Sequence, residues 1–183
     1  MSKKHDEITT AIGSELSKSD ELAKLGYSVI FDHGKEGDKK ADVTTSWIGN
    51  GTEKDNRLSK IDIAIFEKHV DKPVLLIEIE ESGDSPKKII GAVMATLLAD
   101  GISSTLQPNY PIGKWTTLLV LAKGEGETHQ KRIRSLEARI NQLAGGDNIN
   151  RMKIGTIRLM LFQTPDDLKK TIMELLKTHP QYD

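Results

Sequence analysis

Residues 60–91, KIDIAIFEKHVDKPVLLIEIEESGDSPKKIIG, carry the pattern that decides the fold of this chain. Two short runs rich in Ile, Val, Leu and Phe are separated by a polar segment that ends in Pro73. This is the pattern of a strand, a turn and a second strand. Because side chains alternate between the two faces of a strand, Ile61, Ile63 and Ile65 share one face of the first predicted strand, residues 60–66, and Leu75, Ile77 and Ile79 share one face of the second. The stretch therefore predicts a β-hairpin whose turn is centred near Val70.

Three carboxylates interrupt these apolar strands, Asp62 in the first and Glu78 and Glu80 in the second. In the predicted hairpin Asp62 lies opposite Glu78, and Lys60 lies opposite Glu80. Neighbouring carboxylates repel one another, and partial burial raises that cost to several kcal/mol unless a cation neutralises them. Hard oxygen ligands on adjacent strands suit Mg²⁺ or Mn²⁺, and the carbonyl of Ile79 supplies a further oxygen. The alternative is an exposed sheet face with a cross-strand pair of Lys60 and Glu80.

Composition narrows the class of protein. The 183 residues, 37% hydrophobic and 29% charged, fit one globular domain spanning residues 1–183. A formal net charge of −1 excludes a histone-like role, so any contact with nucleic acid comes from local patches. The absence of cysteine removes disulfides, thiolate metal sites and cysteine nucleophiles. With no apolar signal-peptide core and no apolar run of about 20 residues, we expect a cytoplasmic protein that makes no membrane contact.

The first helix contains a candidate acid. Residues 6–25 have helical periodicity, and Gly26 is a natural stop. At about 100° per residue, Ile12 and Leu16 lie on the apolar stripe, and Glu15 projects into the middle of it. A carboxylate on the inward side of a helix usually has a lysine, backbone amides or a metal as its partner. The alternative is a glutamate that reaches water from the rim of the stripe.

A polar segment, residues 33–59, separates the first predicted strand from the hairpin. Such a segment inside a compact domain is more often functional or mobile than structural filler. Its basic side chains are candidates for phosphate contacts, and the alternative is a solvated loop balanced by its own acids. The candidate nucleic-acid-binding residues are Lys35, Lys39, Lys40, Lys54 and Arg57.

The second half of the chain alternates helices and strands. Apolar runs at residues 115–122 and 153–162 are typical of strands, and residues 128–143 and 164–178 have helical periodicity. With a helix following the hairpin, the order is helix, a meander of three strands, helix, strand, helix, strand, helix. This order predicts an α/β fold with one mixed central sheet, antiparallel at first and then parallel through a crossover, with helices on both faces.

The chain resembles the PD-(D/E)xK nuclease superfamily, which includes restriction endonucleases, Holliday-junction resolvases and repair nucleases. The core of that superfamily is the same helix, three-stranded meander, helix and strand. The resemblance covers roughly residues 8–122 and rests on Glu15, on LGY at residues 25–27, on Asp62 in KIDIAIF and on Glu78 with Glu80 in LLIEIEES. It implies a restriction-endonuclease-like core and Mg²⁺- or Mn²⁺-dependent cleavage of DNA.

The resemblance also implies roles for individual residues. Asp62 and Glu78 match the metal-binding acids, and Glu15 matches the helix acid of resolvase-like members. Glu80 stands at the position of the usual lysine. Some restriction endonucleases carry glutamate there and remain active, and other members draw the lysine from a neighbouring element.

Two lysines are candidates for that missing cation. Lys60 shares a strand face with Asp62 and is expected opposite Glu80, so we rank it first. Lys87 lies on the apolar side of the helix after the hairpin, from where it can lean back towards Glu80, whereas Lys88 points away from that stripe. A flexible stem and a compact ammonium suit either lysine to a phosphate or hydroxide partner.

The predicted function is hydrolysis of DNA phosphodiester bonds, with Asp62, Glu78 and the Ile79 carbonyl as metal ligands and Glu80 orienting the attacking water. The rival interpretation is a catalytically degenerate module that binds DNA or protein without cleavage. An enzyme acting on a small phosphorylated substrate is a third interpretation, but the sequence has no phosphate-cradling loop. Nucleases that cut both strands often work as C2 dimers, so we also expect a homodimer.

Overall fold

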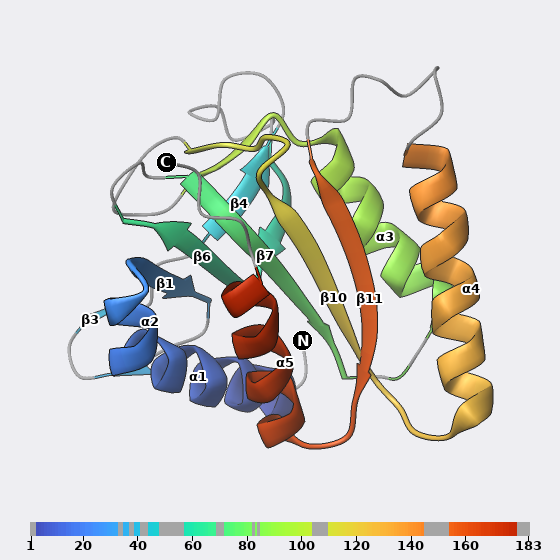
Figure 1. Cartoon of the computed structure of the whole chain (residues 1–183), viewed down its shortest axis with the longest axis horizontal. Helices are drawn as coiled ribbons and strands as arrows, with labels where there is room; N and C mark the ends of the chain where they lie inside the picture. The colour runs from blue at the N-terminus through green and yellow to red at the C-terminus, as the bar shows by residue number, and fades with distance from the viewer. Residues whose placement is uncertain are drawn as a thin grey trace.

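Figure 1 shows a computed structural model of the chain, which describes residues 3–32, 35–36, 39–40, 44–47, 57–68, 72–81, 83, 85–103, 110–144 and 154–178. The helices are α1 (Lys3–Ser17), α2 (Asp20–Lys24), α3 (Pro86–Leu98), α4 (Glu127–Ala144) and α5 (Pro165–Thr178). The strands are β1 (Tyr27–Phe31), β2 (Lys35–Glu36), β3 (Lys39–Lys40), β4 (Thr44–Trp47), β5 (Arg57–Ile61), β6 (Ile63–Glu67), β7 (Lys72–Glu80), β8 (Gly101–Ser103), β9 (Tyr110–Pro111), β10 (Thr117–Lys123) and β11 (Thr156–Phe162).

A mixed five-stranded sheet with the strand order β1-β6-β7-β10-β11 forms the centre of the fold. β6 is antiparallel to both β1 and β7, whereas β10 is parallel to both β7 and β11. The chain passes through α3 between β7 and β10 and through α4 between β10 and β11. The predicted α/β fold, with a sheet that is antiparallel at first and then parallel, is confirmed.

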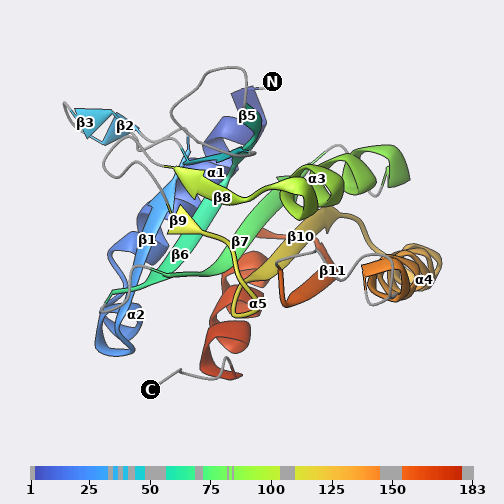
Figure 2. The same ribbon diagram turned by 90° about the horizontal axis from the view of Figure 1, so that it is seen from above.

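Helices cover both faces of this sheet. The views agree that α5 lies on one side of the sheet and that α3 lies with β8 on the other (Figures 1 and 2). The core on the first side joins α1, α2 and α5 to side chains such as Ile63, Ile77 and Ile79, and the core on the second side joins α3 and α4 to Ala64 and Leu76. No helix in the described part of the chain is long and apolar enough to cross a membrane.

The strand expected over residues 60–66 is interrupted at Asp62. β5 belongs to a separate four-stranded sheet with the order β5-β4-β8-β9, whereas β6 belongs to the central sheet. Ile61 is accordingly buried in the core under α3, whereas Ile63 and Ile65 are buried in the core under α1 and α5. The expectation that these three isoleucines share one face is therefore wrong, and Asp62 occupies the corner between the two sheets.

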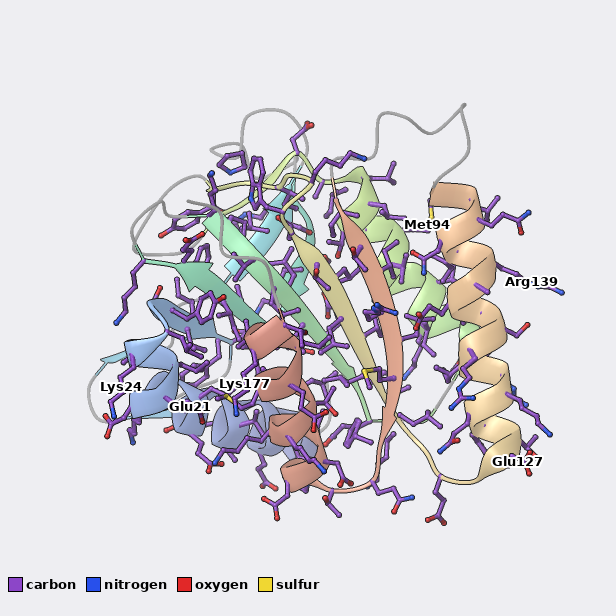
Figure 3. All side chains as sticks on the ribbon, in the orientation of Figure 1. Glu21, Lys24, Met94, Glu127, Arg139 and Lys177 are labelled. Carbon is purple, nitrogen blue, oxygen red and sulfur yellow. The ribbon has the colours of Figure 1, made fainter. Side chains whose placement is uncertain are left out.

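The helix expected over residues 6–25 is two helices, because Ser19 begins a new one. Ser19 has an extended backbone, with φ −71° and ψ 114°, and its hydroxyl accepts a hydrogen bond from the N–H of Leu22 at 3.4 Å. This is the N-cap geometry that serine favours. Glu21 in α2 then forms an ion pair of 2.8 Å with Lys177 in α5, which ties the short helix to the last one (Figure 3).

The outer edge of β11 is covered by side chains of α4. The carboxylate of Glu137 accepts the N–H of Leu159 at 2.7 Å, and the side-chain amide of Asn141 donates to the carbonyl of Ile157 at 3.1 Å. An uncovered edge strand presents backbone groups that can pair with another chain. These contacts satisfy part of the edge and hold α4 against the sheet.

Replacing Glu137 with alanine should lower the free energy of unfolding by about 1–3 kcal/mol, because the Leu159 N–H loses its acceptor at a partly buried position. Urea denaturation measures this change. The matched control is Glu127→Ala in the same helix, whose carboxylate pairs with Lys131 on the exposed surface (Figure 3). That control should leave the denaturation midpoint nearly unchanged. Equal losses in the two variants would contradict the role of Glu137 at the edge.

Candidate functional site

The hairpin register predicted around Asp62 and Glu78 is confirmed for β6 and β7, but it does not extend back to Lys60, which lies on β5 in the other sheet. β6 and β7 pair Ile63 with Ile77. Asp62 directly precedes Ile63, so the same antiparallel register puts it next to Glu78. Asp62 is 5% exposed, and its negative charge acts on the Glu78 carboxyl. The structure thus brings together the two acids that the sequence singled out.

Because β5 belongs to the second sheet, its backbone does not pair with the end of β7, and the Asp62 side chain does so instead. Its Oδ2 accepts the N–H of Ile79 at 2.7 Å. In a continuous strand this N–H would face Ile61, but β5 has turned into the second sheet. Since the N–H and C=O of one residue face the same neighbour in an antiparallel ladder, the Ile79 carbonyl also faces the side of Asp62.

The surroundings of Glu78 disfavour its ionised form. Its Oε1 is buried and has no hydrogen-bond partner among the described residues. Burial raises the pKa of Glu78 well above its usual value, and the charges of Asp62 and then Glu80 raise it further. A cation would relieve both effects, because it would pair the orphaned oxygen and offset the repulsion.

These oxygens fit a divalent cation in kind. Two carboxylates, Asp62 and Glu78, and the Ile79 carbonyl are hard ligands of the sort that Mg²⁺ and Mn²⁺ bind. In the part of the chain that the structure describes, no three histidine or acidic side chains gather into a group that could hold a metal ion. Any ion at this place would therefore depend on the two acids, the carbonyl and water.

Glu80 is paired with a lysine that the sequence did not favour. Lys88 Nζ lies 3.3 Å from Glu80 Oε1. The expected pairing of Lys60 with Glu80 is wrong, because β5 pairs with β4 in the second sheet, where Lys60 lies opposite Thr45. The expectation that Lys87 leans towards Glu80 is also wrong, since the first turn of α3 presents Lys88 to the strand end and leaves Lys87 exposed.

Lys60 instead pairs with Asp32, a residue that the sequence analysis missed. Its Nζ lies 3.3 Å from Asp32 Oδ2, and the backbone N–H of Asp32 donates to the carbonyl of Asp62 at 2.9 Å. Asp32, Asp62 and Glu78 thus occupy neighbouring positions across β1, β6 and β7, and we call this set the acid row. The available signal was an acid directly after the first strand, but its use required knowing that β1 pairs with β6.

Glu15 does not join the acid row. Its side chain is 56% exposed and forms an ion pair with Lys169 of α5, so the expectation that it projects into an apolar stripe is wrong. α1 packs against the sheet face that carries Ile77 and Ile79. Because Glu78 alternates with these isoleucines along β7, it projects to the other face. The packing of α5 beside α1, which sequence periodicity does not reveal, supplies the lysine.

The candidate phosphate-binding residues lie between Asp32 and Asp62 in the chain. Lys35 and Lys39–Lys40 lie on the paired strands β2 and β3, which begin three residues after Asp32. Figure 2 shows this hairpin projecting beyond the central sheet. Arg57 is exposed at the start of β5, and Lys54 lies outside the described residues.

Comparison of the chain with protein-family models, with curated proteins and with solved structures gives no match. The class of this protein is therefore defined by its fold and by the position of its acidic residues. The chain is an α/β protein with a mixed five-stranded sheet flanked by helices, and three acids lie side by side across the antiparallel half of that sheet.

Asp62→Ala should lower the free energy of unfolding by about 1–3 kcal/mol more than Asp62→Asn does, because only asparagine keeps an acceptor for the Ile79 N–H. Both changes remove the charge next to Glu78, so their comparison isolates the hydrogen bond. Urea denaturation and amide hydrogen exchange at Ile79 measure the effect. Equal stability and equal exchange in the two variants would show that this bond contributes nothing.

Glu78→Gln should stabilise the protein at neutral pH in buffer that contains EDTA. Unfolded Glu78 ionises near its usual pKa, whereas the raised pKa of the folded protein keeps it protonated to higher pH. Wild-type stability therefore falls as pH rises from the unfolded pKa through the folded one, and glutamine removes this fall. Free energies of unfolding from about pH 4 to about pH 8 test the difference. Parallel curves for the two proteins would contradict the raised pKa.

Proposed function

We propose that this protein is a metal-dependent endonuclease of the restriction, repair or junction-resolving type, which hydrolyses DNA phosphodiester bonds. The observation that carries the proposal is the buried Glu78 carboxylate, whose Oε1 has no partner among the described residues, beside Asp62. Repulsion of this kind costs stability and persists where a bound ligand offsets it. The sequence resemblance to PD-(D/E)xK nucleases supports the same interpretation.

Asp62, Glu78 and the Ile79 carbonyl would hold Mg²⁺ or Mn²⁺. The cation, when bound, would lower the pKa of a water molecule and offset negative charge on the scissile phosphate. Glu15 is left out of this ligand set because it pairs with Lys169.

The remaining groups would act on the substrate and the water. Glu80 would orient the attacking water and take its proton, while Lys88, 3.3 Å away, moderates the charge of Glu80. Lys60 would stabilise the negative charge that develops on the phosphate. As water attacks phosphorus, one P–O bond breaks, and the departing oxygen takes up a proton.

The location and assembly are part of the same proposal. The lysine-bearing hairpin of β2 and β3, close in sequence to Asp32, supports contact with DNA phosphates. We propose a cytoplasmic enzyme, with which the absence of cysteine accords. Cleavage of both strands of a duplex would call for a homodimer that presents two such sites.

One observation favours a second candidate, a catalytically degenerate module that binds DNA or protein without cleaving it. Asp62 already accepts a hydrogen bond from Ile79, and Glu80 is already paired with Lys88. Two of the three motif acids therefore have protein partners without any ion. In this candidate the acids would stabilise the junction of the two sheets, and the basic hairpin would provide binding alone.

Cleavage of duplex, single-stranded and branched DNA with Mg²⁺, Mn²⁺ or EDTA tests the proposal. We expect cleavage only with a divalent cation, and we expect Asp62→Asn and Glu78→Gln each to slow it by about a hundredfold or more. Glu127→Gln is the control and should cleave at the wild-type rate. DNA binding without cleavage by the wild-type protein would favour the degenerate module, and wild-type turnover in both site variants would reject the site.

A further inference from the structure

We propose that Asp32 is a positioning residue that holds the ammonium group of Lys60 at the Asp32 end of the acid row. This inference rests on the proposed function, in which Lys60 would stabilise charge on the scissile phosphate. Asp32 lies outside every residue pattern on which the nuclease resemblance rests.

The backbone fixes the location of Asp32. β1 and β6 pair Phe31 with Ile63, and the next step along β1 is Asp32, whose N–H donates to the Asp62 carbonyl at 2.9 Å. Alternation along β1 puts Asp32 on the face of Ile30, which packs against the core that contains β5 and α3. The Asp32 carboxylate therefore projects towards the sheet from which Lys60 comes.

Lys60 reaches Asp32 from the second sheet. It lies on β5 opposite Thr45 of β4, and its Nζ lies 3.3 Å from Asp32 Oδ2. The Lys60 side chain is 52% exposed, whereas that of Asp32 is 3% exposed. A half-exposed lysine has many accessible rotamers, so its ammonium has no fixed place without a partner that is itself fixed. The buried Asp32 carboxylate, held by the β1–β6 register, is such a partner.

Lys60 and Lys88, which pair with Asp32 and Glu80, have different surroundings. Lys88 pairs with Glu80 beyond the end of the acid row, and the Glu80 side chain is 22% exposed. Lys60 pairs with a nearly inaccessible carboxylate that is hydrogen-bonded to the backbone of Asp62. An ion pair that includes a fixed, buried partner restricts its lysine more than an exposed pair does. Lys60 is therefore held by a carboxylate whose own backbone is bonded to Asp62.

Cleavage kinetics of Asp32→Asn, Lys60→Met and the double variant test the inference. Lys60→Met should lower kcat by about a hundredfold, which is typical for loss of one electrostatic stabiliser. Asp32→Asn should lower kcat by about tenfold and change KM by less than about twofold, because it loosens the lysine without removing it. The double variant should be no slower than Lys60→Met, since Asp32 acts through the lysine. The exposed ion pair of Glu21 and Lys177 is the control, and Glu21→Gln and Lys177→Met should keep the wild-type rate (Figure 3).

A loss of rate from Asp32→Asn that is equally large in the Lys60→Met background would overturn the inference, because Asp32 would then act independently of the lysine. An unchanged kcat in Asp32→Asn would overturn it as well. Neither result would affect the proposed function, which depends on cleavage by the wild-type protein.

A second measurement needs no turnover. During titration with Mg²⁺, the side-chain ¹³Cε signal of Lys60 should shift with the same midpoint as the amide signal of Ile79, which reports on Asp62. In Asp32→Asn the Lys60 shift should become smaller while the Ile79 shift remains. A Lys60 signal that is silent in the wild-type protein while Ile79 responds would overturn the inference alone. No response at Ile79 would overturn the proposed metal site at Asp62 and, with it, this inference, whereas the proposed function would still be decided by cleavage.

Discussion

The hydrogen bond from the Ile79 N–H to Asp62 Oδ2 is the contact on which the arrangement of the two sheets depends. The last residues of β7 extend past Ile63, the first residue of β6, and β5 does not pair with them because it belongs to the second sheet. A buried N–H without an acceptor would cost about 1–3 kcal/mol. The Asp62 carboxylate supplies the acceptor, and this allows the chain to pass at that residue from β5 of the second sheet into β6 of the central one. The same bond brings a carboxylate next to Glu78.

The acid row follows from this corner. Asp32 directly follows β1, Asp62 directly precedes β6 and Glu78 lies in β7, so the three acids are neighbours across the sheet. Lys60 pairs with Asp32 at one end of the row, and Lys88 pairs with Glu80 beyond the other end. Burial and the neighbouring charges raise the pKa of Glu78 between them. A protein that needed only a stable sheet junction would gain by an apolar residue at that position. A buried carboxylate that is repelled by its neighbours and has an unpaired oxygen among the described residues is the physical basis of the proposed site.

The parallel half of the sheet is mostly apolar, and the antiparallel half carries the acidic residues. The parallel half is built around β10, which is apolar on both faces because helices cover both. Its outer edge on β11 is covered by Glu137 and Asn141 of α4. The antiparallel half carries the acid row and leads directly into the β2–β3 hairpin. The well-packed parallel half therefore supports the antiparallel half, which carries the acid row.

Local pattern alone determined the α/β class, the strand order of the meander and the pairing of Asp62 with Glu78, because periodicity and turn position act over a few residues and a slip of one residue would expose the apolar face. Only the tertiary structure decided which partners the charged groups have. β5 pairs with β4 and not with β7, so Lys60 reaches Asp32 and not Glu80. Likewise α5 lies beside α1, so Glu15 pairs with Lys169 on the surface. These ion pairs depend on contacts between segments far apart in the chain, so the spacing of residues within one helix or strand cannot predict them.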